Sequence, residues 1–326
     1  MTRPSHTPVL LAQSIEMLAP RSGGIYCDAT VGLGGHAEAI LEASAPDGCL
    51  VGVDRDPDAL ALAGDRLRRF EDRVVLRHGR FSDLPVLLAS LDLPGRPAAG
   101  GGILDGLLLD LGVSSLQLDD PRRGFSFRES GPLDMRMDPH RGRSASELLG
   151  SLSEEELARL LRRFGEQPRS RAVARAIKAY LDEEPEPDTA GLARIVAAVL
   201  PPRRQGGLHP ATQTFMAIRI AVNEELEELE SLLGSLLSLL IPGGRVAVIS
   251  FHSLEDRLVK RKFEYLCRAG ADLPPGLPVT EAERGPAPCF RLTRRAMEPT
   301  EAEASSNPRA RSARLRAIGR SPQVVP

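Results

Sequence analysis

The sequence IYCDATVGLGGHAEAILEASAPDGCLVGVD, residues 25–54, gives the clearest indication of the fold class. It begins with an apolar run and ends in a second apolar run that closes on Asp54. Between the runs lies a turn with three glycines, Gly32, Gly34 and Gly35, followed by a helix-forming segment. The apolar runs predict buried strands, so the stretch predicts the strand–helix–strand unit of a parallel sheet.

The same alternation extends outward from this stretch in both directions along the chain. It reaches Leu111 and, after a segment of different character, resumes from Pro210. We therefore predict an α/β fold of the Rossmann-like type, with a mostly parallel sheet and helices on both faces. The expected strands are residues 25–30, 49–54, 74–77, 106–111, 245–251 and 290–294, and the expected helices around them are 7–19, 36–45, 57–70, 84–91 and 254–266.

The intervening segment predicts a second domain. Residues 113–143 are rich in Asp, Arg, Gly and Pro without periodicity, and residues 144–200 carry helical patterns throughout. We expect a discontinuous domain of 1–112 and 210–326, interrupted by a mainly helical domain of 113–209. The tail from Arg309 to Arg320 is basic and is expected to pack poorly.

Composition excludes several classes of protein. The chain has 326 residues, 42% apolar and 26% charged, with a net charge of −2, which is typical of a globular protein with a core rather than a polycation. No run of 18 apolar residues predicts a membrane span, and no N-terminal segment resembles a signal peptide. The four cysteines, at 27, 49, 267 and 289, lack metal-ligand spacing, so we expect reduced thiols, no bound metal and a cytoplasmic location.

The glycine turn predicts a nucleotide-like ligand. Residues without a Cβ let the backbone approach a ligand closely, and Asp54 ends the next strand, where an acid accepts hydrogen bonds from a ribose diol. The pattern Gly32-x-Gly34-x-x-Ala37 fits a dinucleotide, and it fits S-adenosylmethionine equally well. Phe81, after the third strand, would either cover an adenine or belong to the core.

The carboxyl ends of two later strands carry further candidates. Asp110 ends an apolar strand, where a carboxylate is costly unless it is paired or solvated in a cleft, and this favours a functional role. His252 and Ser253 follow the fifth strand at the same edge. His252 would either take up a proton or hold the turn. Glu255 and Asp256 are expected to cap the following helix.

Two groups of arginines are candidate contacts for a polyanion such as RNA. Phosphate contacts supply affinity, and a basic stripe does not require a basic total charge. Phe125 and Phe127, between the arginines of the first group, would either stack on an extruded base or anchor their loop. The first group is Arg122, Arg123, Arg136, Arg141 and Arg143, and the second, in the tail, is Arg309, Arg311, Arg314, Arg316 and Arg320.

Taken together, these residues resemble the bacterial 16S ribosomal RNA (cytosine-N4)-methyltransferase family, of the MraW/RsmH type. Each matching motif is short, but their joint order and spacing are specific, and they run nearly from end to end of the chain. The matching segments are residues 6–10, 34–36, 110–115, 117–119, 123–127, 131–138, 209–212, 219–224, 251–257 and 307–313.

The resemblance implies a class I S-adenosylmethionine-dependent fold with an inserted helical domain for substrate recognition. It also implies methylation of the exocyclic N4 amine of a cytidine in the decoding centre of 16S ribosomal RNA, with RNA in the small ribosomal subunit as partner. Oligomeric state does not follow from it. The cofactor contacts that it implies are Gly34, Gly35, His36, Asp54, Phe81, Asp110 and Gln117.

The chemistry leaves the catalytic acceptor open. Cytosine N4 is a weak nucleophile, and acceptors on its N–H bonds would stabilise the charge that develops. Other amino-methylating enzymes carry a polar residue, two prolines and an aromatic residue here, whereas this chain has Asp110-Leu111-Gly112-Val113. The candidate catalytic residues are Asp110, His252 and Ser253. Cys289 is disfavoured as a nucleophile for methylation at C5, because it lies far in sequence from the fourth strand.

Two other classes of function remain alternatives. A nicotinamide-dependent oxidoreductase would use the same glycine turn, although no catalytic pair of a second domain is recognisable. A non-enzymatic ribosome-assembly factor would keep the fold for binding RNA. Cofactor binding separates the first from a methyltransferase, and methyl transfer separates the second.

Overall fold

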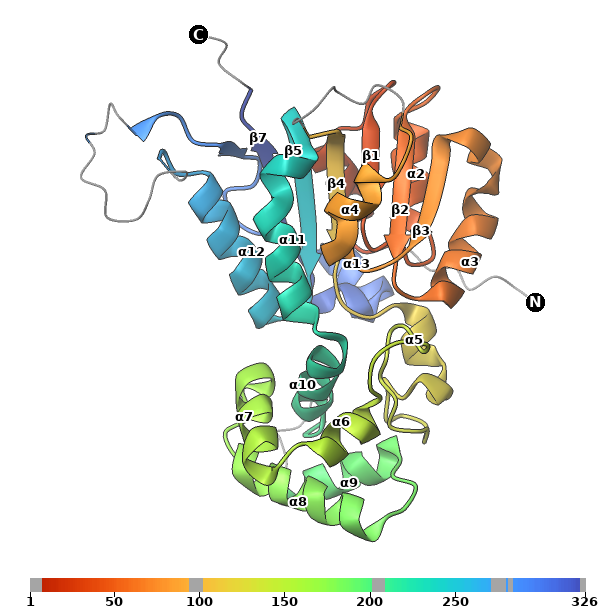
Figure 1. Cartoon of the computed structure of the whole chain (residues 1–326), viewed down its shortest axis with the longest axis vertical. Helices are drawn as coiled ribbons and strands as arrows, with labels where there is room; N and C mark the ends of the chain where they lie inside the picture. Colours follow the sequence, from red (N-terminus) through yellow and green to blue (C-terminus); the bar gives the residue numbers. More distant parts are fainter. Residues whose placement is uncertain (1–7, 94–101, 201–208, 271–279, 281–283, 323–326) are drawn as a thin grey trace. The chain divides into compact units, whose positions relative to one another are not determined.

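The computed structural model describes residues 8–93, 102–200, 209–270, 280 and 284–322. The chain divides into two compact units (Figure 1): the first comprises Met1–Gly112 with Glu227–Pro326, and the second Val113–Leu226. Within the described residues, no helix has both the length and the apolarity that crossing a bilayer requires.

The first unit is built on a seven-stranded sheet in the order β3-β2-β1-β4-β5-β7-β6. The five strands from β3 to β5 in this order pair in parallel, and β7 runs antiparallel to both of its neighbours. This confirms the predicted Rossmann-like class I fold. The strands are β1 (Ile25–Asp28), β2 (Cys49–Asp54), β3 (Val74–His78), β4 (Leu104–Asp110), β5 (Leu240–Ser250), β6 (Cys289–Arg291) and β7 (Arg314–Arg320).

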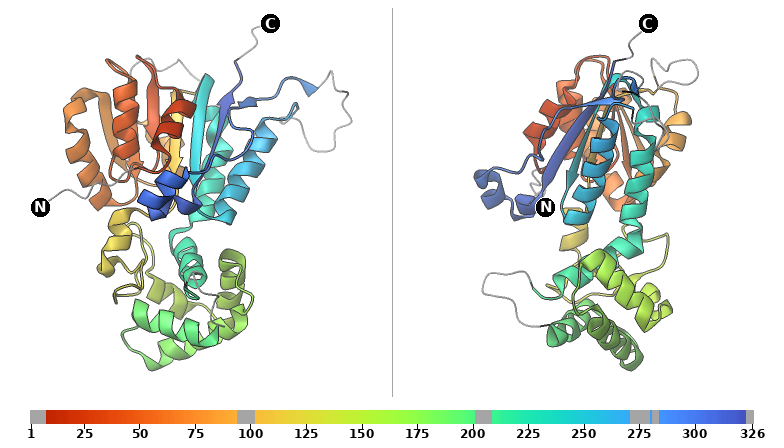
Figure 2. Two further views of the ribbon diagram at one scale, coloured as in Figure 1. Left: turned by 180° about the vertical axis from the view of Figure 1, so that it is seen from behind. Right: turned by 90° about the vertical axis from the view of Figure 1, so that its left-hand side faces the viewer.

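Helices cover both faces of this sheet, which explains why its strands are apolar without alternation. Leu107 and Leu109 of β4 belong to one apolar cluster, with residues of α4, α11 and α12. Leu108 belongs to the other cluster, with residues of α1, α2 and α3. Figure 1 shows the first set of helices over the near face, and the left view of Figure 2 shows the sheet from behind. The helices are α1 (Leu11–Leu18), α2 (Gly35–Ala43), α3 (Pro57–Leu67), α4 (Leu84–Ala89), α11 (Glu225–Leu239), α12 (Ser253–Leu266) and α13 (Glu301–Ser306).

The strand order places the ligand site. β1 pairs with β2 on one side and with β4 on the other, so the direction of winding reverses between β1 and β4. In open α/β sheets, ligands bind outside the carboxyl ends of the strands at such a reversal. Three adjacent strands end here in an acid: Asp28 on β1, Asp54 on β2 and Asp110 on β4.

Two predicted boundaries are wrong for local reasons. The first helix begins at Leu11 rather than at residue 7, because Leu10 has a left-handed backbone and donates its N–H to the Glu303 carboxylate at 2.7 Å. β5 begins at Leu240 rather than at residue 245, and residues 242–244 form a bulge within it. The pairing with β4 shifts there, from Leu104 opposite Leu240 to Gly106 opposite Arg245.

The prediction of a poorly packed tail is also wrong. Residues 314–320 form β7, which pairs with both β5 and β6 inside the sheet. Arg316 donates to both carboxylate oxygens of the buried Asp256, at 2.7 and 3.0 Å, and Arg314 reaches the same carboxylate at 3.4 Å. Burial acts to raise the pKa of Asp256, but the hydrogen bonds and charges of these arginines prevail and lower it. Arg314 and Arg316 therefore hold the fold together.

Replacing Arg316 by alanine should lower the free energy of unfolding by about 2 kcal/mol, because a buried carboxylate loses its main partner while Arg314 remains. Urea denaturation checks this. The exposed Arg311 is the matched control, and Arg311→Ala should change stability by less than about 0.5 kcal/mol. Equal, small changes in the two variants would show that the ion pair does not stabilise the sheet.

The second unit is helical. It contains α5 (Ser115–Asp119), α6 (Ala145–Ser151), α7 (Glu154–Gly165), α8 (Ser170–Glu183), α9 (Thr189–Val199) and α10 (Thr212–Asn223). Serine caps with reciprocal glutamate bonds start α6 and α7. The boundary expected at 209/210 differs from the division at 226/227, because α10 packs on α7 and α6 within the second unit.

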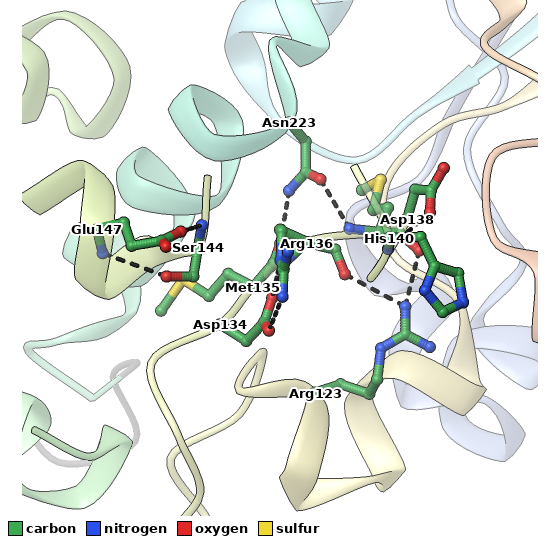
Figure 3. Close-up of polar contacts among 10 residues, drawn as sticks. Arg123, Asp134, Met135, Arg136, Asp138, His140, Ser144, Glu147 and Asn223 are labelled. Carbon is green, nitrogen blue, oxygen red and sulfur yellow. Dashed lines mark hydrogen bonds and ion pairs between the residues drawn. The ribbon is translucent and has the colours of Figure 1, made fainter. Parts of the chain in front are cut away.

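A buried polar network fixes the irregular segment before α6 (Figure 3). Asn223, at the end of α10, accepts from the N–H of Met137 at 2.8 Å and donates to the carbonyl of Met135 at 2.7 Å. Arg123 donates to the carbonyl of Met137 at 2.7 Å, and Arg136 forms a two-pronged pair with Asp134. The motifs around residues 131–138 and 219–224 therefore meet in one network of the second unit.

Candidate active site

The glycine turn joins β1 to α2 and connects it to β2. Gly32 and Gly34 have φ values of +50° and +79°, which favour glycine. A Cβ on Gly35 would lie 2.4 Å from Cγ of Pro8. The N–H of Gly32 donates to Oδ2 of Asp54 at 2.8 Å. The turn is therefore a tight backbone cradle at the amino end of α2, held to the end of the neighbouring strand.

Two backbone hydrogen bonds hold the Asp54 carboxylate at the carboxyl edge of the sheet. Its Oδ2 accepts from Gly32, and its Oδ1 accepts from the N–H of Asp56 at 2.9 Å. Burial raises the pKa of Asp54 to about 6, against the pull of these two hydrogen bonds. Each oxygen keeps a further lone pair, so the group is able to accept hydroxyl donors from a ligand.

Asp110 ends β4 beside the same turn. Its N–H donates to Oγ1 of Thr30 at 2.7 Å, and its Oδ2 lies 3.6 Å from Nδ1 of His36. Its Oδ1 is buried and has no hydrogen-bond partner among the described residues. Burial first, then the charges of Asp28 and Glu255, raise the pKa of Asp110 well above its usual range. An acceptor held in this way at a ligand edge is typical of a functional group.

His36 is oriented by its neighbours. Its Nε2 lies 3.0 Å from the carbonyl oxygen of Val9 and its ring is buried. A carbonyl only accepts, so Nε2 carries the proton in this contact and Nδ1 faces Asp110. The histidine thus forms one wall of the space beside the Asp110 carboxyl.

Asp28 was missed as a candidate, although it stands in the quoted stretch. It is buried, its Oδ1 accepts from the N–H of Thr30 at 3.2 Å, and burial raises its pKa to about 7. Thr30 in turn accepts from Asp110, so one threonine links the two strand ends. The signal that would have found Asp28 is the one that found Asp110: an acid ending an apolar strand.

His252 and Ser253 follow β5, with His252 capping α12. Nδ1 of His252 accepts from the N–H of Glu255 at 3.5 Å, and Nε2 lies 3.1 Å from Oε1 of Glu255. Oε2 of Glu255 accepts from the N–H of Phe251 at 2.8 Å. This geometry supports a turn-holding histidine and a capping Glu255. Proton transfer by His252 and a catalytic part for the exposed Ser253 stay predictions.

The other candidates lie on two different units. Phe81 begins a short 3-10 helix after β3, is half-buried, and packs against the core cluster of the first unit. Its neighbour Arg80 pairs with the buried Glu228, as does Arg55, at 3.3 Å each. Gln117 lies in the second unit, where its side chain closes the cap of α5 by accepting from the N–H of Ser114.

Several predicted RNA contacts are engaged within the second unit. Arg122 pairs with Asp120, and Arg123 and Arg136 belong to the network of Figure 3. Phe125 is buried, and Phe127 packs against the rings of Phe215 and His209, at centroid distances of 4.7 and 4.8 Å. Of the two roles considered, the structure supports loop anchoring for both phenylalanines.

Comparison with known proteins places this geometry in a family. The profile of the MraW methylase family matches residues 3–321. The chain is 49% identical over 319 residues to ribosomal RNA small subunit methyltransferase H of Syntrophotalea carbinolica, covering 97% of this chain and 98% of that protein. The proteins of the same name from Syntrophobacter fumaroxidans (48%, covering 96% and 95%) and Thermomicrobium roseum (49%, covering 97% and 94%) are similar over comparable lengths. The chain therefore belongs to the MraW methylase family, and, as a methylase with the Rossmann-like class I fold, it uses S-adenosylmethionine.

Proposed function

We propose that this protein methylates the exocyclic N4 amine of a cytidine in the decoding centre of 16S ribosomal RNA. The observation that carries the proposal is Asp110, whose buried Oδ1 has no partner among the described residues at the carboxyl end of β4. The names of the relatives support a ribosomal RNA of the small subunit as substrate. The place of action is then the cytoplasm, on RNA within the small subunit.

The residues around the glycine turn fit the cofactor. A side chain at Gly34 would strain a backbone with positive φ, and a Cβ on Gly35 would clash with Pro8. Asp54 offers lone pairs for a ribose diol. We assign cofactor binding to these three residues together with His36, Phe81, Asp110 and Gln117. When bound, S-adenosylmethionine supplies an electrophilic methyl group. Membership of a methylase family also removes the oxidoreductase alternative that the glycine pattern left open.

Asp110 has two tasks in this proposal. It accepts a hydrogen bond from one N4–H bond of the cytosine, which orients the amine and favours its pyramidal form. It then takes the proton that N4 loses as the methyl carbon exchanges its bond to sulfur for a bond to nitrogen, which would leave a neutral thioether as the other product. A raised pKa suits the second task, because a more basic carboxylate is the better proton acceptor. His252 at the adjacent strand end is the second proposed acceptor, and Ser253 a further proposed contact.

Methyl transfer with nucleoside analysis tests the proposal. Purified protein is incubated with S-adenosylmethionine labelled in the methyl group and with small subunits from cells that lack this protein. The 16S RNA is then digested, and N4- and C5-methylated cytidines are separated before mass spectrometry. We expect the label in N4-methylcytidine. Label in 5-methylcytidine contradicts the proposed chemistry, and RNA binding without any label favours an assembly factor.

A further inference from the structure

A cavity of about 300 Å³ lies on the first unit, on the α12 face of the sheet edge formed by β7 and β6. Its wall comes from α12, β6, β7 and the segment that follows β6. Five cations and one acid line it: Lys260, Arg291, Arg294, Arg295, Arg316 and Glu264.

Two of the five cations form ion pairs with residues that the structure describes. Arg316 binds Asp256, and Nζ of Lys260 lies 3.9 Å from Oε1 of Glu264. Arg291, Arg294 and Arg295 are exposed, and none of them makes an ion pair with a residue that the structure describes. Three like charges around one hollow repel each other, so the site favours an anionic ligand.

The two adjacent arginines sit on a segment whose ends are fixed to β7. On one side, the N–H of Ala317 donates to Oγ1 of Thr293 at 3.0 Å. On the other side, Met297 and Leu315 exchange two backbone hydrogen bonds of 2.9 Å. Arg294 and Arg295 therefore project from a short anchored connection, which reduces the entropy lost when they bind a ligand.

The lining indicates which part of a nucleic acid fits. Guanidinium groups match phosphate oxygens in two-pronged pairs. The one aromatic residue of the wall, Phe263, is buried and offers no face for stacking a base. The wall thus suits the sugar–phosphate backbone, whose recognition does not depend on sequence.

The sheet order relates this cavity to the active site. From β4, which carries Asp110, the strands run β5, β7 and β6, and β6 carries Arg291. Arg291 lies level with Leu107, three residues before Asp110 on β4, so Asp110 and Arg291 are about 14 Å apart across the strands and about 10 Å apart along them. We propose that the cavity binds backbone phosphates of the same RNA whose cytidine reaches Asp110. This inference rests on the proposed function and adds the place where the substrate backbone is held.

A matched pair of double variants tests the proposal in the full-length protein. Arg294→Glu with Arg295→Glu alters the cavity. Arg68→Glu with Arg77→Glu makes the same change of net charge at the β3 edge, the opposite end of the sheet. The probe is a fluorescein-labelled single-stranded RNA with the sequence of the 16S decoding region, and its Kd is measured by anisotropy over a range of NaCl concentrations.

We expect the cavity variant to bind RNA at least about tenfold more weakly than the control at low salt. The slope of log affinity against log salt should fall by about 1.4, as two lost phosphate contacts require for single strands. Affinity for S-adenosylmethionine should stay unchanged. Equal weakening in both variants, with equal slopes, would overturn the proposal. The proposal would also be overturned if the cavity variant lost binding of inorganic phosphate but bound RNA as before, because the cavity would then be a site for small anions.

These outcomes are separable from failure of the proposed function. If the wild-type protein binds RNA through the cavity and transfers no methyl group, the proposed function fails and the RNA site stands. If the wild-type protein transfers the methyl group to N4 and the cavity variant binds RNA like its control, the RNA site alone fails.

Discussion

Asp110→Asn is expected to lower methyl transfer by a factor of about 1,000 or more while raising the stability of the protein. The loss follows because an amide cannot take the proton that N4 releases and cannot stabilise the developing positive charge as a carboxylate does. The gain follows because Asp110 carries a buried oxygen without a described partner and lies near two other carboxyls. A neutral side chain removes the cost of burying a charge beside these two carboxyls.

The raised pKa of Asp110 also predicts how the stability of the protein changes with pH. The pKa of Asp110 is raised in the folded protein, so the folded state keeps a proton that the unfolded state releases near pH 4. The free energy of unfolding therefore falls as the pH rises from about 4 towards the folded pKa. In the Asp110→Asn variant, the decrease in the free energy of unfolding that comes from this carboxyl should be absent. Urea denaturation of both proteins between pH 4 and pH 8 measures the difference.

Asp105 on the same strand is the matched control. It lies at the opposite end of β4, where it pairs with Arg21 at 2.5 Å and accepts from the N–H of Ile25 at 3.0 Å. The Asp105→Asn variant should transfer methyl groups at the wild-type rate, and its free energy of unfolding should be lower by about 1 kcal/mol. An Asp110 variant that behaves like the Asp105 variant would assign Asp110 to the scaffold rather than to the reaction.

Asp54→Ala is expected to weaken the binding of S-adenosylmethionine by about 100-fold. Two hydrogen bonds to a charged acceptor, at about 1.5 kcal/mol each, account for this factor. The turn itself also loses the bond from Gly32 to Asp54. Isothermal titration calorimetry checks the loss, and Asp58→Ala, an exposed acid in the first turn of α3, serves as the control with unchanged affinity.

The pKa of about 6 at Asp54 adds a pH dependence to this binding. Ligand hydroxyls donate to the ionised carboxylate, so affinity should rise as the pH increases through about 6 and level off near pH 7.5. Asp54→Ala should flatten this part of the profile. An affinity that does not vary between pH 5 and pH 8 in the wild-type protein would remove Asp54 from the ribose contact.

Local patterns were enough to predict the sheet and its edge. Strands, glycines and terminal acids are encoded within a few residues, so Asp54 and Asp110 were found where the structure has them. The bulge of β5 was not predictable, because Pro242–Gly244 has the composition of a turn and only its pairing with β4 makes it part of a strand. β7 was missed because charged residues hide a strand whose acidic partner lies about 60 positions away.

The roles of single residues in the candidate site depended on long-range contacts. The contact of His36 with Asp110 joins residues 74 positions apart, and that of Thr30 with Asp110 spans 80. Sequence spacing gives no sign of such neighbours. Residue type alone also misplaced the arginines. Arg123, Arg136 and Arg316 are predicted to contact RNA, but they bind groups within the protein. Arg294 and Arg295, which are not among the predicted RNA contacts, line the basic cavity.

A crystal structure of the protein with S-adenosylmethionine bound would show whether the cofactor lies between Asp54 and Asp110 at the glycine turn. We expect the ribose diol on the Asp54 carboxylate, the cofactor over Gly34 and Gly35, and the methyl group facing the space beside Asp110. A cofactor bound elsewhere, or a methyl group directed away from the Asp110 carboxyl, would contradict the account.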